Sequence, residues 1–219
     1  MTDVYSLKDK NDDLVVMAQD LAAIACVYGQ GTIPAKLSVN PAGELLPLPT
    51  NWFALGELDQ KAGAKISPEI KTTDVYGYGS MAPRRTVKTE ESVTVSFSAQ
   101  ESRNINLSMF WGKDLSGVTA DANGEWQFKK SGQSGLIYYS IILIGQDSNS
   151  AGDVFPYWIF PKTTITKTDA IQLQNDSAII YPFQFQTFED KAYGGYVGVG
   201  SAGAGQAAVN AAAGFASGS

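Results

Sequence analysis

Hydrophobic and polar residues alternate along much of this chain, most clearly over residues 86–98. Apolar residues occupy one face of that run: Val87, Val93, Val95 and Phe97. Polar residues occupy the opposite face: Glu90, Ser92, Thr94 and Ser96. One dry face and one wet face are typical of an antiparallel strand in a sandwich or barrel.

The same alternation predicts strands at residues 126–129, 135–144, 155–160, 165–173 and 178–188. Turn residues separate these runs, and Asn123-Gly124 predicts a tight hairpin because both residues tolerate positive φ. Proline has no amide hydrogen for a strand ladder. We therefore expect Pro161 to close one strand and Pro182 to mark an edge or a bulge in the last one.

Helical periodicity is strongest over residues 101–112, where Ile105, Met109 and Trp111 fall near one stripe and Gly112 supplies a stop. Residues 12–20 also permit a helix; the alternative, which argues against that helix, is that residues 22–28 are the first strand. The predicted fold class is mainly β. It comprises two packed antiparallel sheets, as a sandwich or flattened barrel, with one short flanking helix.

Three further segments lack a regular pattern. Residues 33–49 are rich in proline and predict a long connection, and residues 74–85 predict a long projecting loop. The last part, residues 194–219, is almost wholly Gly, Ala, Ser and Val. It is interpreted either as a disordered tail or as an arm that orders on a neighbouring subunit. The expected organisation is an arm at 1–20, a β domain at 21–192 and a tail or arm at 193–219.

Composition excludes most chemical sites. The chain has no His and a single cysteine, Cys26, which predicts a small buried hydrophobe and no disulfide. Glu90 and Glu91 are adjacent in a strand and point to opposite faces, so they cannot flank one substrate. We expect no catalytic residues, no metal and no cofactor. The four tryptophans are expected in the core or at subunit contacts rather than in a sugar-binding platform.

The charge and hydropathy of the chain limit the kinds of partner that it is expected to bind. Sixteen basic residues against 22 acidic ones give a net charge of −6, which argues against a protein that grips phosphate backbones. It is consistent with an acidic wall that repels DNA. The apolar run at residues 14–28 contains Gln19 and Asp20 and is too short to span a bilayer, so no membrane insertion by this chain is expected.

The order of these segments resembles that of the major tail tube protein of long-tailed bacteriophages, in the tail tube and secretion-tube superfamily. The resemblance begins at Trp52-Phe-Ala-Leu-Gly56 and continues through a strand at 64–71, the loop ending in Arg84-Arg85, the long alternating strand and the helix. It closes with the strands from Tyr157 to Asp190 and covers residues 22–190. The acidic start and the charge-free tail depart from the family pattern.

The resemblance implies a structural virion protein, not an enzyme, that self-assembles into helically stacked hexameric rings. The tube would conduct genome DNA during ejection, and double-stranded DNA would pass without specific binding. Further expected partners are the tail tip or initiator, the tape measure and the tail terminator, with synthesis in the host cytoplasm. The alternative function is a β-sandwich module of a phage tail that binds carbohydrate or a receptor.

Two sets of residues are candidates for assembly and transport. The projecting loop would reach the next ring through Asp74, Tyr76, Tyr78, Met81, Arg84 and Arg85. For the two arginines, solvated loop charge and an inter-ring ion pair or hydrogen bond remain equal alternatives. The lumen would be lined by the polar face of the long strand, with Glu90, Ser92, Thr94 and Ser96.

Overall fold

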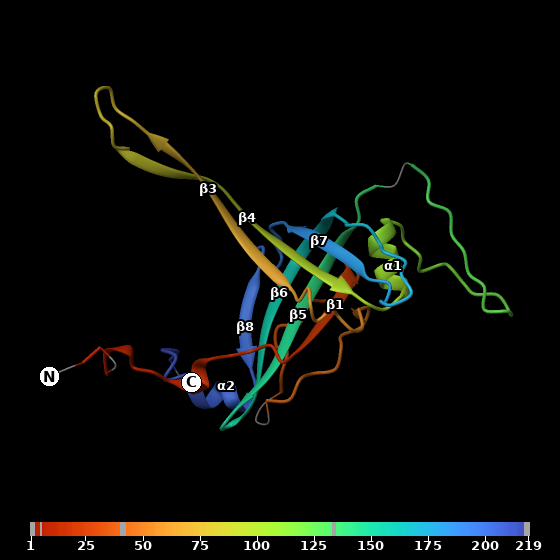
Figure 1. Ribbon diagram of the computed structural model, residues 1–219, viewed down its shortest axis with the longest axis horizontal. Coiled ribbons are helices and arrows are strands. Elements are labelled where there is room, and N and C mark those ends of the chain that lie inside the picture. Colours follow the sequence, from red (N-terminus) through yellow and green to blue (C-terminus); the bar gives the residue numbers. More distant parts are fainter. Residues whose placement is uncertain (1–2, 5, 40–42, 133–134, 217–219) are drawn as a thin grey trace.

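Antiparallel strands dominate the computed structural model, which confirms the mainly β fold (Figure 1). It describes residues 3–4, 6–39, 43–132 and 135–216; parts of the predicted connection and of both terminal segments lie outside these ranges. The strands are β1 (Asp20–Val27), β2 (Phe53–Ala54), β3 (Lys65–Val75), β4 (Arg85–Ala99), β5 (Tyr138–Asn149), β6 (Gly152–Lys167), β7 (Tyr181–Thr187) and β8 (Gly198–Ala202). The helical elements are η1 (Ser6–Lys8), η2 (Asp12–Leu14), α1 (Asn104–Trp111) and α2 (Ala204–Val209).

The strands form one hydrogen-bonded sheet in the order β2-β1-β5-β6-β7-β4-β3, with β8 added to β6. The segment after β2 links distant parts of this sheet. The Leu55 amide donates to Ala23 of β1 at 2.9 Å, and the Asp59 amide donates to Ser98 of β4 at 2.8 Å. The expected two layers are therefore parts of one continuous sheet that this segment draws together at one end.

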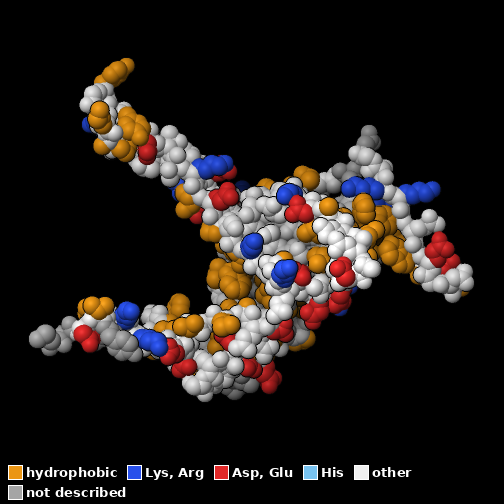
Figure 2. Space-filling model, in the orientation of Figure 1, with side chains coloured by type: hydrophobic (Ala, Val, Ile, Leu, Met, Phe, Trp, Pro, Cys, Tyr) orange, Lys and Arg blue, Asp and Glu red, His pale blue; other side chains and the backbone are white. Residues whose placement is uncertain are grey.

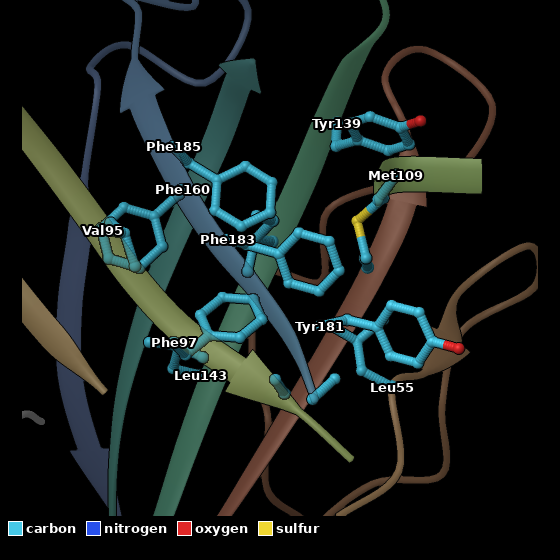
Figure 3. Close-up of a cluster of buried hydrophobic side chains, with 14 of the residues drawn as sticks. Leu55, Val95, Phe97, Met109, Tyr139, Leu143, Phe160, Tyr181, Phe183 and Phe185 are labelled. Carbon is cyan, nitrogen blue, oxygen red and sulfur yellow. The ribbon is translucent and has the colours of Figure 1, made fainter. Parts of the chain in front are cut away.

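In the main core, Met109 of α1 packs with side chains from β4, β5, β6 and β7 (Figure 3). The Phe97 ring stacks on that of Phe185 with centroids 5.4 Å apart, and Phe183 meets Phe97 edge-on. These side chains come from β4 and β7, whose alternation was the clearest sequence signal. Burial of the apolar face is therefore what fixes the register of these two strands.

Proline positions gave one wrong prediction and one confirmed one. Pro161 does not end a strand, since β6 continues through it: Pro161 and Lys162 together lie opposite the single residue Ser140, in a bulge. The Ser140 hydroxyl donates to the Pro161 carbonyl at 2.6 Å. A bulge tolerates a missing amide donor. Pro182 does mark a local edge, because β6 pairs with β7 only from Gln184 onward.

The predicted helix is confirmed as α1, which ends at Gly112 with φ of 59°. The helical interpretation of residues 12–20 is wrong beyond the single turn of η2, and the first strand begins at Asp20. The strand predicted at 126–129 is also wrong. Residues 126–129 are not in a strand, and the rings of Trp126 and Phe128 stack on each other with centroids 6.4 Å apart. Of residues 165–173, only 165–167 are in a strand.

The glycine-rich final segment is ordered against β6, so the interpretation as a disordered tail is wrong for residues 198–209. β8 pairs with β6 from Phe155 to Ile159. A Cβ on Gly200 would lie 2.4 Å from the Tyr157 ring, so this close approach requires glycine. The small residues that suggested disorder are therefore the ones that allow β8 to lie on tyrosine rings.

Truncation after Lys191 is expected to lower the free energy of unfolding by more than about 2 kcal/mol, because it exposes the buried Phe155 and Ile159. The measurement is chemical denaturation of the truncated and full-length chains. Truncation after Gly214 is the matched control, since it leaves β8 and α2 in place. Equal unfolding midpoints for all three chains would show that β8 does not contribute to stability.

Candidate functional site: a projecting hairpin and a polar sheet face

The outer halves of β3 and β4 extend beyond the rest of the sheet as a two-stranded hairpin (Figure 1). Burial along β4 begins at Ser92, and every residue from 85 to 91 is exposed on both faces of the ribbon. At about 3.3 Å per residue, the hairpin reaches roughly 25 Å past the last buried residue, Val93. Such a ribbon has no core of its own and is marginal without a partner surface.

The predicted projecting loop at 74–85 is thus the end of a hairpin. Asp74 pairs with Thr86 and Val75 with Arg85, so the strands extend to these residues and only 76–84 form the turn. The turn is closed by a hydrogen bond from the Arg84 amide to the Val75 carbonyl, 2.8 Å long. The glycines and Pro83 in this stretch suggested a loop and obscured the strand signal before it.

A bulge divides the hairpin from the sheet. Lys71 pairs with Glu90 and Thr72 with Lys88, so Thr89 is unpaired and its hydroxyl donates to the Lys71 carbonyl at 3.1 Å. One extra residue reverses the alternation beyond it. Val87 therefore lies on the Glu90 face, not with Val93 as predicted from the sequence.

The hairpin tip, defined here as residues 74–85, exposes large apolar side chains. Tyr78 and Met81 have relative exposures of 112% and 103%, and Tyr76 has 58%. Figure 2 shows these hydrophobic side chains at the far end of the projection. Arg84 and Arg85 are also exposed, while Asp74 accepts a hydrogen bond from the Thr86 hydroxyl at 2.6 Å. A grouped apolar surface of this kind is typical of a protein contact.

The second candidate surface is the polar face of β4 and its neighbours, and the structure brings Glu90, Ser92, Thr94 and Ser96 together on it. Cross-strand partners extend it. Gln184 and Gln186 of β7 pair with Ser96 and Thr94, and Ser67 of β3 pairs with Thr94 on the other side. The sequence reasoning did not single out these partners, although the alternation in β7 was the signal that could have identified them.

Charges on this polar face balance. β3 contributes Lys65, Glu69 and Lys71, opposite Ser96, Ser92 and Glu90 of β4. The Lys71 and Glu90 side chains form an ion pair of 2.7 Å. The hydrogen bond to Glu90 raises the pKa of Lys71, but both groups are exposed and the pair contributes little to stability. The acidic wall expected from the net charge is therefore not present here; the face is neutral and rich in hydroxyl and amide groups.

The remaining outer face of the sheet is covered by the chain itself. Ile24, Ile142 and Ile159 are buried under the connection before β2, which contributes Leu37 and Trp52. The Trp52 indole donates to the Thr32 carbonyl at 3.0 Å. Cys26 lies in the same cluster as a free, fully buried thiol whose pKa is raised by burial, so the prediction of a small buried hydrophobe is confirmed.

Among the residues that the structure describes, no group of three or more acidic or cysteine side chains could hold a metal ion. Glu91 forms an ion pair with Lys88, while Glu90 forms one with Lys71.

In the same described ranges, no helix has the length and apolar character needed to cross a membrane. Trp111 and Trp126 are exposed, and the ring of each contacts the Phe128 ring, so that the three form a second aromatic group.

The N-terminal segment is held by Asp147, near the turn between β5 and β6. The Asp147 carboxylate accepts the Met17 amide at 2.6 Å and the Gln19 side-chain amide at 2.7 Å. Hydrogen bonds from Met17 and then Ser148 hold the pKa of Asp147 below its ordinary value. The neighbouring Val15 and Met17 side chains remain exposed.

Acidification is expected to release this segment. Because the folded pKa is depressed, the stabilising effect of Asp147 is fully present above the ordinary carboxyl value of about 3.9 and is lost as the pH falls through the lower folded value. At neutral pH, Asp147→Ala should raise hydrogen exchange at the Met17 amide by about tenfold. Asp153→Ala, at an exposed position nearby, is the control, and equal protection in both variants would contradict the assigned role.

The fold places the chain among mainly β proteins, with an exposed projecting hairpin. A family model described as phage tail tube protein matches residues 11–196, and the chain belongs to this family. It is therefore a structural component of phage tails.

Two solved structures are similar over most of the chain. One is described as the cryo-EM structure of the anti-feeding prophage (AFP) baseplate: 7% identity, TM-score 0.42, covering 87% of this chain and 97% of that one. The other is described as a crystal structure of Hcp protein: 11% identity, TM-score 0.30, covering 82% and 97%. A search of curated proteins finds no match to the chain.

Proposed function

We propose that the chain assembles into stacked hexameric rings that form the tail tube, the conduit for genome DNA during ejection. The observation that carries this proposal is the hairpin, which is exposed on both faces and ends in Tyr76, Tyr78 and Met81. A contact between this projection and a different surface of the next subunit is head-to-tail, and such contacts extend without limit unless they close.

The polar face of β3, β4 and β7 is the proposed lumen wall. Its Ser, Thr and Gln side chains are at least partly exposed, and its Lys and Glu residues balance in number. Without an excess of basic groups, a wall gains nothing from counterion release and does not retain duplex DNA. The protein therefore acts as a passive wall without a catalytic role. The other proposed partners are the tail tip or initiator, the tape measure and the terminator, with synthesis in the host cytoplasm.

A binding module is the second candidate, favoured by the exposed Trp111 and Trp126, whose rings pack on the half-buried Phe128. Sedimentation velocity over a concentration series separates the two functions. A tube subunit should pass from small species to very large ones above a threshold concentration. A binding module should instead keep one sedimentation coefficient, and that result at all concentrations, with tail tip supplied as initiator, would contradict the proposal.

A further inference from the structure

A cavity of about 640 Å³ lies beside α1, at the end of the sheet away from the hairpin. We call it the end cavity. Its apolar lining comes from four separate segments and consists of Val27, Phe53, Ala54, Ile105, Ile137 and Tyr139. Polar side chains, among them Arg103 and Asp114, complete the lining. Phe53 remains 53% exposed there. The volume is in the range of about 300–1,000 Å³ found for sites that enclose a small ligand, so it can accommodate a few side chains of a partner.

The end cavity and the hairpin tip are connected by one continuous strand, β4. β4 begins at the tip with Arg85 and ends at Ala99, shortly before α1 begins at Asn104. Figure 1 shows the tip and α1 on opposite sides of the molecule. A projection at one end and an apolar recess at the other are the two unlike surfaces that a head-to-tail contact requires.

We propose that the end cavity receives the hairpin tip of a subunit in the adjacent ring; this inference rests on the proposed tube function. Tyr76, Tyr78 and Met81 supply apolar side chains that have no partner within their own chain's core. Aromatic side chains in a well-enclosed pocket are the usual energetic centre of a protein contact. Docking would cover both Phe53 and the tip.

Charge complementarity favours this occupant. Within the end cavity, Arg103 is paired with Glu101 at 2.6 Å, whereas Asp114 is an exposed carboxylate that accepts the Ser116 amide at 2.9 Å. The tip carries two arginines and one aspartate, Asp74. The N-terminal segment of another copy is also apolar at residues 14–17, but it is preceded by Asp12 and Asp13, which Asp114 would repel.

The direct test places a photo-activatable phenylalanine at position 78 in the full chain, irradiates assembled tubes and maps the crosslinked peptides. We expect intersubunit crosslinks to the peptides that contain Phe53, Ile105 or Ile137. Crosslinks concentrated elsewhere, including residues 14–17, would overturn the inference, as would assembled tubes with no intersubunit crosslink. If the wild-type chain forms no tubes even with an initiator, the proposed function fails first, and this inference fails with it.

A substitution gives an independent measurement. Phe53→Asp puts a charge into the end cavity at a position that is already half exposed, so the chain should fold with an unchanged melting temperature. The threshold concentration for tube formation should rise at least about tenfold, the equivalent of about 1.4 kcal/mol. Leu173→Asp, at an exposed apolar site outside the cavity, is the matched control. Equal thresholds for the two variants would contradict docking at the cavity.

Discussion

Replacing residues 76–84 by Asn-Gly is expected to leave a folded protein that forms no tubes. Val75 and Arg85 are cross-strand partners, and a two-residue Asn-Gly turn connects such a pair with the correct twist. The removed residues include no buried side chain, so thermal unfolding should be unchanged. Elongation should be lost because the apolar side chains that contact the next ring are absent. Circular dichroism reports folding, and sedimentation reports elongation.

A conservative double variant tests whether elongation requires the apolar area of the tip or the exact residues that provide it. Tyr78→Phe with Met81→Leu keeps the apolar area and should preserve tubes, although the threshold concentration can shift within a few-fold. Tubes of normal length from the shortened hairpin would refute the role given to the tip. Loss of cooperative unfolding in that variant would instead show that the hairpin stabilises the fold.

Introducing lysine at Ser92, Thr94 and Ser96 is expected to slow DNA ejection by at least about tenfold while tubes still assemble. The three side chains are only partly buried, so longer side chains can extend outward from the face. Repeated in every subunit, the added charges would bind phosphates and release counterions, so the delay should shrink steeply as salt is raised. The measurement is the rate of genome release from virions built with the variant.

The matched control carries glutamate at the same three positions. Glutamate enlarges these side chains as lysine does, but it carries the opposite charge. Ejection should stay close to the wild-type rate because acidic groups repel DNA. Equal rates for the lysine and glutamate variants, in tubes of normal appearance, would mean that this face does not line the channel.

The sequence predicted the structure best where burial of one face makes apolar and polar residues alternate along a strand. The alternation in β4 and β7 follows from one face packing on the core. The polar candidates from Glu90 to Ser96 share a face for the same reason. The helix α1 and its stop at Gly112 were also predicted, but its buried residues are consecutive, from Asn106 to Met109, and do not form the predicted stripe. The effect of Pro182 was also predicted, because proline has no amide hydrogen to donate to a neighbouring strand.

It failed where neighbours in space decide the structure. Pro161 lies in a bulge set by its cross-strand partner Ser140, and that partner cannot be identified from local sequence. β8 is formed by glycines that have low strand propensity but allow contact with Tyr157. The end cavity is assembled from segments as distant as Val27 and Tyr139. No local pattern could have predicted it.

The most direct test of the tube account is electron cryomicroscopy of the purified chain above its threshold concentration, with helical reconstruction. We expect a hollow tube of stacked six-membered rings. Each hairpin should cross to the adjacent ring, and Ser92, Thr94 and Ser96 should face the channel. Closed particles without a channel, or a tube in which this polar face points outward, would contradict it.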